Sequence, residues 1–245
     1  MIMLRAFCLA AALCGSLPLG AAAQEKVEPD YSIWDVVLGQ PVTQIPEALI
    51  SELACGTNGG PPAQTLTAFE DFATCAPEAS GLHELTFFYD DEQDYIARAL
   101  ESEYRFLQGG TSIFAHPVIV AVLVDAAGLV QGIRIVTDNR ISDRERRTAV
   151  TLMRNFKARY SDWVLDCADL PLRDGEQPVG NQFTHELCTG TSADGTLRIA
   201  IESSYLRKKG QRAINLETQT VNTGYFESQT RFEQVLAPYM PTVAP

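Results

Sequence analysis

The most constraining feature of the sequence is an apolar hairpin near its middle, from Pro117 to Thr137. Its first half, Val118 to Val124, is an unbroken apolar run, and its second half also contains many β-branched residues. The Asp-Ala-Ala-Gly sequence that separates the two halves favours a turn. Because a strand that is apolar on both faces belongs inside a sheet, we predict an interior position for this hairpin.

The N-terminus has the pattern of a secretory signal peptide. Arg5 precedes a short apolar run, and Ala21 to Ala23 supply the small residues of a cleavage site. We therefore predict cleavage near Ala23 and a periplasmic or secreted mature protein. A lipoprotein signal at Cys14 is the alternative, but the small residue required before that cysteine is missing. Beyond the signal, no stretch is apolar for long enough to predict a membrane span.

The cysteines that remain after cleavage predict a disulfide framework. They are Cys55, Cys75, Cys167 and Cys188. An even number of cysteines in an exported chain indicates disulfides, and three connectivities are open to four cysteines. We favour Cys55 with Cys75 and Cys167 with Cys188, because each pair closes a local loop of about twenty residues, a closure worth roughly 3 kcal/mol. A zinc site is the alternative, although no metal-binding spacing supports it, and we expect neither a metal nor a cofactor.

The charge balance argues against a nucleic-acid partner. The chain has 19 Lys and Arg against 31 Asp and Glu, a formal net charge of −12. Loss of Arg5 with the signal peptide makes the mature chain one unit more negative. This acidic excess disfavours binding to a phosphate backbone, and net charge otherwise bears on solubility and encounter more than on fold.

The patterning predicts an α+β fold with a mostly antiparallel sheet and helices on one face. Apolar spacing indicates helices over 46–54, 96–107 and 142–160, a strand over 82–89, and a second hairpin that joins 196–205 to 211–221. The order helix, cysteine, loop, cysteine, strand occurs in both halves of the chain, which suggests two related units, each with a local disulfide. Whether these units share one sheet or form two stays open.

The predicted organisation has five parts. They are a signal peptide at 1–23, a flexible leader at 24–33, a first α+β unit at 34–115, the central hairpin with a second α+β unit at 116–237, and a flexible tail at 238–245.

No motif of the chain predicts catalysis. A nucleophile elbow and a zinc-protease motif are absent, and the three histidines are scattered. The alternative is a cell-envelope hydrolase that uses His83, Glu84 or the acidic run Asp90 to Asp94. The acids of that run have a simpler explanation, since carboxylates stabilise a helix N-terminus. We name no catalytic residue.

The leading hypothesis is an exported, soluble and non-catalytic binding or inhibitor-like module that acts on a protein or an envelope component. It would bind through the sheet face that the helices leave uncovered. Aromatic and arginine side chains supply most contact energy at interfaces. The candidate binding residues are Phe88, Tyr205, Tyr225, Arg147 and Arg154. A third possibility is a structural accessory subunit of an envelope complex.

Overall fold

The structure is a computed structural model that describes residues 31–89, 111–140, 143–208, 213–215, 220–222 and 226–242. The predicted signal peptide, the helix expected at 96–107 and the acidic run 90–94 lie outside these residues.

The described residues form predominantly β structure. The strands are β1 (Ser51–Cys55), β2 (His83–Phe88), β3 (Thr111–Ile113), β4 (His116–Val124), β5 (Val130–Thr137), β6 (Leu165–Asp169), β7 (Glu176–Gln177), β8 (Thr184–Thr191), β9 (Leu197–Lys208), β10 (Ala213–Asn215), β11 (Thr220–Asn222) and β12 (Glu227–Leu236). The helical segments are α2 (Asp143–Ala149), α3 (Leu152–Arg159) and the short 3-10 turns η1 (Ile33–Asp35), η2 (Val42–Gln44), η3 (Glu47–Leu49) and η4 (Phe69–Thr74).

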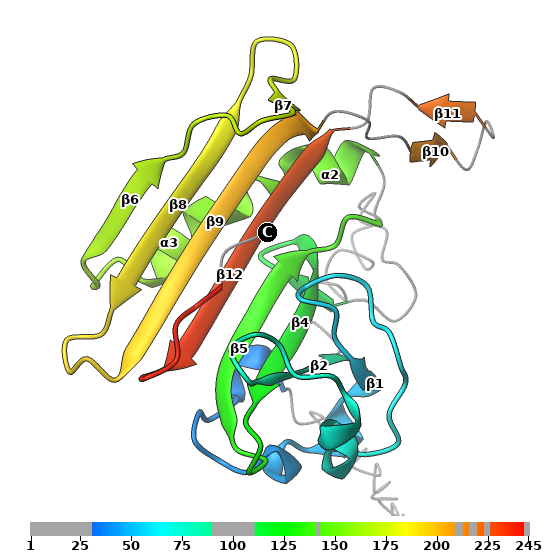
Figure 1. Cartoon of the computed structure of the whole chain (residues 1–245), viewed down its shortest axis with the longest axis vertical. Helices are drawn as coiled ribbons and strands as arrows, with labels where there is room; N and C mark the ends of the chain where they lie inside the picture. Colours follow the sequence, from blue (N-terminus) through cyan, green and yellow to red (C-terminus); the bar gives the residue numbers. More distant parts are fainter. Residues whose placement is uncertain are drawn as a thin grey trace, which may run out of the picture.

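One antiparallel sheet runs through both halves of the chain. Its strand order is β1-β2-β4-β5-β12-β9-β8-β6, with β3 added to β4 and β7 added to β9. The hairpin β4–β5 lies between β2 and β12, so its predicted interior position is confirmed. Figure 1 shows the long strands β8, β9 and β12 side by side, with β5 and β4 continuing the sheet beyond them.

The prediction of an α+β fold is wrong, because the described residues consist mainly of this ten-stranded sheet with two short α-helices. The segment expected to be a helix over 46–54 contains only the turn η3 before the chain enters β1. β1 pairs with β2, and these inter-strand hydrogen bonds take the place of a local helix. The described residues therefore do not form the two related helix-containing units that were expected either.

The prediction of a hairpin that joins 196–205 to 211–221 is also wrong. β9 pairs with β8 on one side and with β12 on the other, while β10 and β11 form a small sheet of their own. β9 carries Ile199 and Ile201 into the core, and a central position buries them more fully than a two-stranded hairpin could. The last strand, β12, lies inside the sheet between β5 and β9.

The main core lies on the face of the sheet that α3 and the N-terminal turns cover. Phe232 of β12 is fully buried there and stacks on Phe156 of α3, with ring centroids 4.8 Å apart. Tyr160 stacks on the ring of Phe232 with centroids 5.4 Å apart, and Trp34 of η1 packs against the ring of Phe232 in a T-shaped arrangement at 5.8 Å. Figure 1 shows α2 and α3 behind β8, β9 and β12. This aromatic cluster fastens the helices and the N-terminal segment to the sheet.

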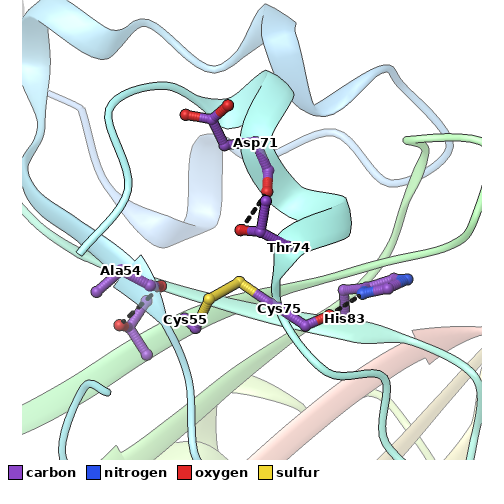
Figure 2. The surroundings of a disulfide bond; sticks show 7 residues. Ala54, Cys55, Asp71, Thr74, Cys75 and His83 are labelled. Carbon is purple, nitrogen blue, oxygen red and sulfur yellow. Dashed lines mark hydrogen bonds between the residues drawn. A yellow bond between two sulfur atoms is a disulfide. The ribbon is translucent and has the colours of Figure 1, made fainter. Parts of the chain in front are cut away.

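Both disulfides have the pairing favoured from the sequence. Cys55 is bonded to Cys75, and Cys167 is bonded to Cys188. Figure 2 shows the first bond, which ties the end of β1 to the residue that follows η4. The second joins residues directly opposite each other on β6 and β8, with Cα atoms 4.0 Å apart.

We expect Phe232→Ala to lower the free energy of unfolding by about 3–5 kcal/mol, because it removes the ring on which three other aromatic side chains pack. Urea denaturation followed by fluorescence measures this loss. Val164→Ala is the control, since Val164 is 89% exposed and its truncation should change stability by less than about 0.5 kcal/mol. Similar small losses for both variants would contradict the assigned core.

Candidate functional site: a buried charge network beside a cationic cleft

Charged side chains cross the centre of the sheet on the face opposite the aromatic core. Alternation along β12 places Phe232 on one face and its neighbours Arg231 and Glu233 on the other. Glu233 is directly opposite Arg134 of β5, and Glu84 of β2 projects to the same face. Each of these four side chains is less than 5% exposed. Buried charges require partners. These four side chains find their partners in one another and in chain segments that pack on this face of the sheet.

Arg134 is the hub of the network and contacts three carboxylates. Its Nε donates to Glu233 Oε2 at 2.9 Å. Its two terminal nitrogens donate to the carboxylate of Glu78 at 2.5 and 2.9 Å, a bidentate pair. Glu84 Oε1 lies 3.0 Å from Nη1. Every nitrogen of this guanidinium therefore faces a carboxylate oxygen.

The two arginines of the network experience different electrostatic environments. Burial opposes the charge of Arg134, but the hydrogen bond with Glu78 and the attraction of Glu84 and Glu233 raise its pKa above the ordinary value. The pKa of Arg231 is lowered, first by burial and then by repulsion from Arg134, and Glu233 and Glu84 offset this only in part. Both guanidiniums remain charged, because arginine does not lose its proton in proteins.

The loop after β1 closes over one end of the network. The backbone nitrogens of Asn58 and Gly59 donate to the carboxylate of Glu84, the second at 2.8 Å. In return, Arg231 donates to the carbonyl oxygen of Asn58 at 2.9 Å and to its side-chain oxygen at 2.8 Å. Gly59 has φ of +79°, and a Cβ there would lie 2.5 Å from Val136 Cγ2. Only glycine allows this close approach of loop and sheet.

The C-terminal segment, residues 238–242, covers the network from the other side. Figure 1 shows the chain turning back after β12 and passing over the front of that strand. The hydroxyl group of Thr242 donates to Glu233 at 2.9 Å and accepts hydrogen bonds from Arg231 at 2.8 Å and Arg134 at 3.2 Å. Thr242 is thus bonded to three of the charged side chains of the network.

A cationic cleft of about 260 Å³ opens beside Arg231, near the ends of β5 and β12. We define it by its lining residues: Thr57, Asn58, Gly59, Gly60, Ile119, Thr137, Asn139, Arg146, Lys208, Glu227, Ser228, Gln229 and Arg231. Three of these side chains are cations and one is a carboxylate, so cations predominate in the lining of the cleft.

The cations of the cleft are held in place by neighbouring groups. Lys208 Nζ lies 2.9 Å from Glu227 Oε2 across β9 and β12. The guanidinium of Arg146 packs over the ring of Phe226, 4.8 Å from its centroid. These contacts fix the side chains before a ligand arrives, which lowers the entropic cost of binding.

Two of the predicted binding residues lie outside the cleft lining but pack against one ring, that of Phe226. Arg147 lies 6.0 Å from the centroid of the Phe226 ring, and Tyr205 packs against the same ring at 5.3 Å. Phe88 is instead 4% exposed on β2, and Arg154 is exposed on α3. Tyr225 lies outside the described residues.

The side chains suggested for a hydrolase do not converge in the described part of the chain. The ring of His83 bonds the carbonyl oxygen of Cys75 through Nδ1 at 2.7 Å, next to the disulfide (Figure 2). Its neighbour Glu84 projects to the opposite face of β2 and is bound to Arg134. His185 pairs with Glu202 at 2.9 Å on a different strand pair. The acids 90–94 lie outside the described residues.

A second cavity, of about 400 Å³, lies between η1, the end of α3 and the sheet. Both tryptophans of the chain, Trp34 and Trp163, line it. Arg159 stacks over Trp34 at 3.9 Å, and the hydroxyl group of Tyr160 donates to Gln234 at 2.6 Å. Burial raises the pKa of Tyr160 to about 12, and Arg159 counteracts this only in part. The aromatic side chains that line this second cavity are thus engaged in contacts within the protein.

Metal-ligating atoms come together at one point of the described residues, formed by Cys167, Glu186 and Cys188. Both sulfur atoms belong to the disulfide, and the carboxylate of Glu186 pairs with Lys157. A metal would need free thiolates, so this group does not fit one.

Sequence reasoning missed the charge network and the cleft. The available signal was a charged residue inside a β-branched run, as at Arg134 between Ile133 and Ile135, and the charges on both sides of Phe232. A charge at such a position must be either exposed or paired. Which carboxylates pair with it depends on strand order, which local patterning does not supply.

We expect Arg134→Met to lower the free energy of unfolding by about 3–5 kcal/mol, because it leaves carboxylates buried without their cation. Chemical denaturation measures the loss. Lys157→Met is the matched control, since the Lys157–Glu186 pair is partly exposed and should contribute less than about 1 kcal/mol. If both variants lowered the free energy of unfolding by the same amount, Arg134 would contribute no more than a partly exposed ion pair, which would contradict the buried network.

Comparison with known proteins assigns no relative to the chain. No protein-family model, no curated protein and no solved structure matches it. The function is therefore inferred from the chemistry of the described residues.

Proposed function

We propose that the chain is an exported binding module without catalytic activity, which uses the cationic cleft to hold an anionic group of a protein or an envelope component. The observation that carries this proposal is the convergence of Arg146, Lys208 and Arg231 on one cleft. The expected ligand group is a carboxylate or a phosphate, because guanidinium and ammonium donors match both.

The two disulfides support the exported compartment, since such bonds persist in oxidising environments. Among the described residues, none of the helices has the length and apolar character needed to cross a membrane.

Local charge favours the cleft as the site of encounter. The chain as a whole carries a formal net charge of −12 and repels anions at long range. A cleft that concentrates cations therefore offers an anionic group a local minimum of potential. The hydroxyl groups of Thr57 and Ser228 add polar contacts to the lining.

Binding is favoured over hydrolysis because the acidic side chains near the cleft already have cationic partners. Glu84 and Glu233 are bound to Arg134, and Glu227 is bound to Lys208. A general acid or base needs a side chain that can exchange a proton with a substrate. The hydrolase hypothesis would regain support if the acids 90–94 were found to be essential for an activity.

We expect Lys208→Gln to weaken anion binding by about three- to tenfold, because it removes a cation from the cleft. Glu227→Gln should strengthen anion binding by a similar factor, because it removes the carboxylate that competes with the anion for Lys208. Calorimetric titration with inorganic phosphate and with a hexaglutamate peptide, at low ionic strength, measures both affinities. A response to phosphate alone indicates a phosphorylated ligand, and a response to the peptide indicates an acidic protein segment.

The control is Lys157→Gln, a cation on α3 outside the cleft lining, which should leave both affinities unchanged. Failure of both probes to bind, or equal effects of Lys157→Gln and Lys208→Gln, would overturn the proposal.

A further inference from the structure

The backbone of the C-terminal segment is hydrogen-bonded to side chains of the sheet at both of its ends. Nη1 of Arg198 donates to the carbonyl oxygens of Pro238 and Tyr239 at 2.9 and 3.0 Å. At the other end, Arg231 Nε donates to the carbonyl oxygen of Thr242 at 3.2 Å, and the backbone nitrogen of Thr242 donates to Glu233 Oε1 at 3.1 Å. Contacts of this kind recognise an extended chain with little regard to its sequence.

One side chain of the segment is recognised specifically. The hydroxyl group of Thr242 makes three hydrogen bonds, one to Glu233 and two from the arginines 134 and 231. A hydroxyl group both donates and accepts, which suits a position between a carboxylate and two guanidiniums. A residue without a hydroxyl group at this place would leave those charged groups with fewer partners.

Little apolar surface fastens the segment. Tyr239 packs on the small cluster of Leu82, Leu123 and Val235, whereas Met240 is 64% exposed. The main aromatic core lies on the other face of the sheet and does not depend on this segment. Release of the segment would expose the charged groups of the network, which water solvates well, and the small apolar cluster under Tyr239. A chain of similar chemistry that took its place would restore both kinds of contact.

We infer that the surface under the C-terminal segment, formed by Arg198, Arg231, Glu233 and Arg134, is a binding site for an extended peptide of another polypeptide that carries Ser or Thr at the position of Thr242. The C-terminal segment of the chain itself occupies this site and competes with that peptide. The inference goes beyond the cationic cleft, because the site binds backbone and hydroxyl groups instead of an anion. Arg231 contributes to both.

The competition predicts the direction in which a loosened segment changes the affinity for an added peptide. A tethered segment acts at a high effective concentration, so the full chain binds the same sequence weakly when it is added as a separate peptide. A substitution that loosens the tethered segment reduces the competition and strengthens binding of the added peptide. A purely structural segment would give no such gain.

The test is a titration of the full chain with a fluorescent peptide that has the sequence of residues 237–245, followed by fluorescence anisotropy. We expect Thr242→Val in the chain to tighten binding of this peptide by about tenfold, since hydrogen bonds to charged groups are each worth roughly that factor. Tyr239→Ala should also tighten it, through loss of the tethered packing contact and without change to the charge network.

Two controls define the outcome. Thr191→Val, an exposed position on β8, should leave the affinity unchanged, and a peptide with Thr242→Val should bind the Tyr239→Ala chain about tenfold more weakly than the original peptide. The inference is overturned if both loosened variants, with native circular dichroism spectra, bind the peptide no better than the unsubstituted chain. Concentration-dependent dimerisation of these variants, abolished by the peptide, would identify a second copy as a partner.

Discussion

The enclosure of Arg134 among three carboxylates is the interaction on which the second face of the sheet depends. A guanidinium inside a sheet is costly unless every donor has a partner, and here the partners come from separate parts of the chain. Glu84 belongs to β2, Glu233 to β12, and Glu78 to the loop between η4 and β2. The network thus demands that these segments arrive in one arrangement, and it provides specificity of assembly more than net stability.

The sequence predicted those features that depend on local pattern. The unbroken apolar run of β4 identified an interior strand, and the short spacing of the cysteines identified both disulfides. Features that depend on distant pairing were missed. β9 was assigned to a local hairpin because Ile199 and Ile201 alternate equally well in either pairing, and only the position of β12 decides between them. The segment 46–54 has helical spacing, but its pairing with β2 prevails over propensity.

The residues that line the cleft were not predicted, for a similar reason. Arg147 and Tyr205 were chosen for their chemistry, and the structure places both against Phe226, outside the cleft lining. Arg231 could not be chosen, since its surroundings come from the loop at Asn58 and from Thr242, remote in sequence. The same side chain lines the cleft and contacts the C-terminal segment.

The placement of the disulfides has a consequence for the two ends of the sheet. The strand order ends with β1 on one side and β6 on the other, and each of these edge strands contains a bonded cysteine, Cys55 and Cys167. An edge strand that peels away exposes unpaired backbone groups to neighbouring molecules and invites aggregation. The second bond ties β6 directly to β8, and Asp166 and Asp169 add negative charge along β6. The first bond ties β1 to the residue after η4, and the outer side of β1 is hydrogen-bonded to residues 63–66. Strand addition is thereby opposed by charge at β6 and by the covering segment at β1.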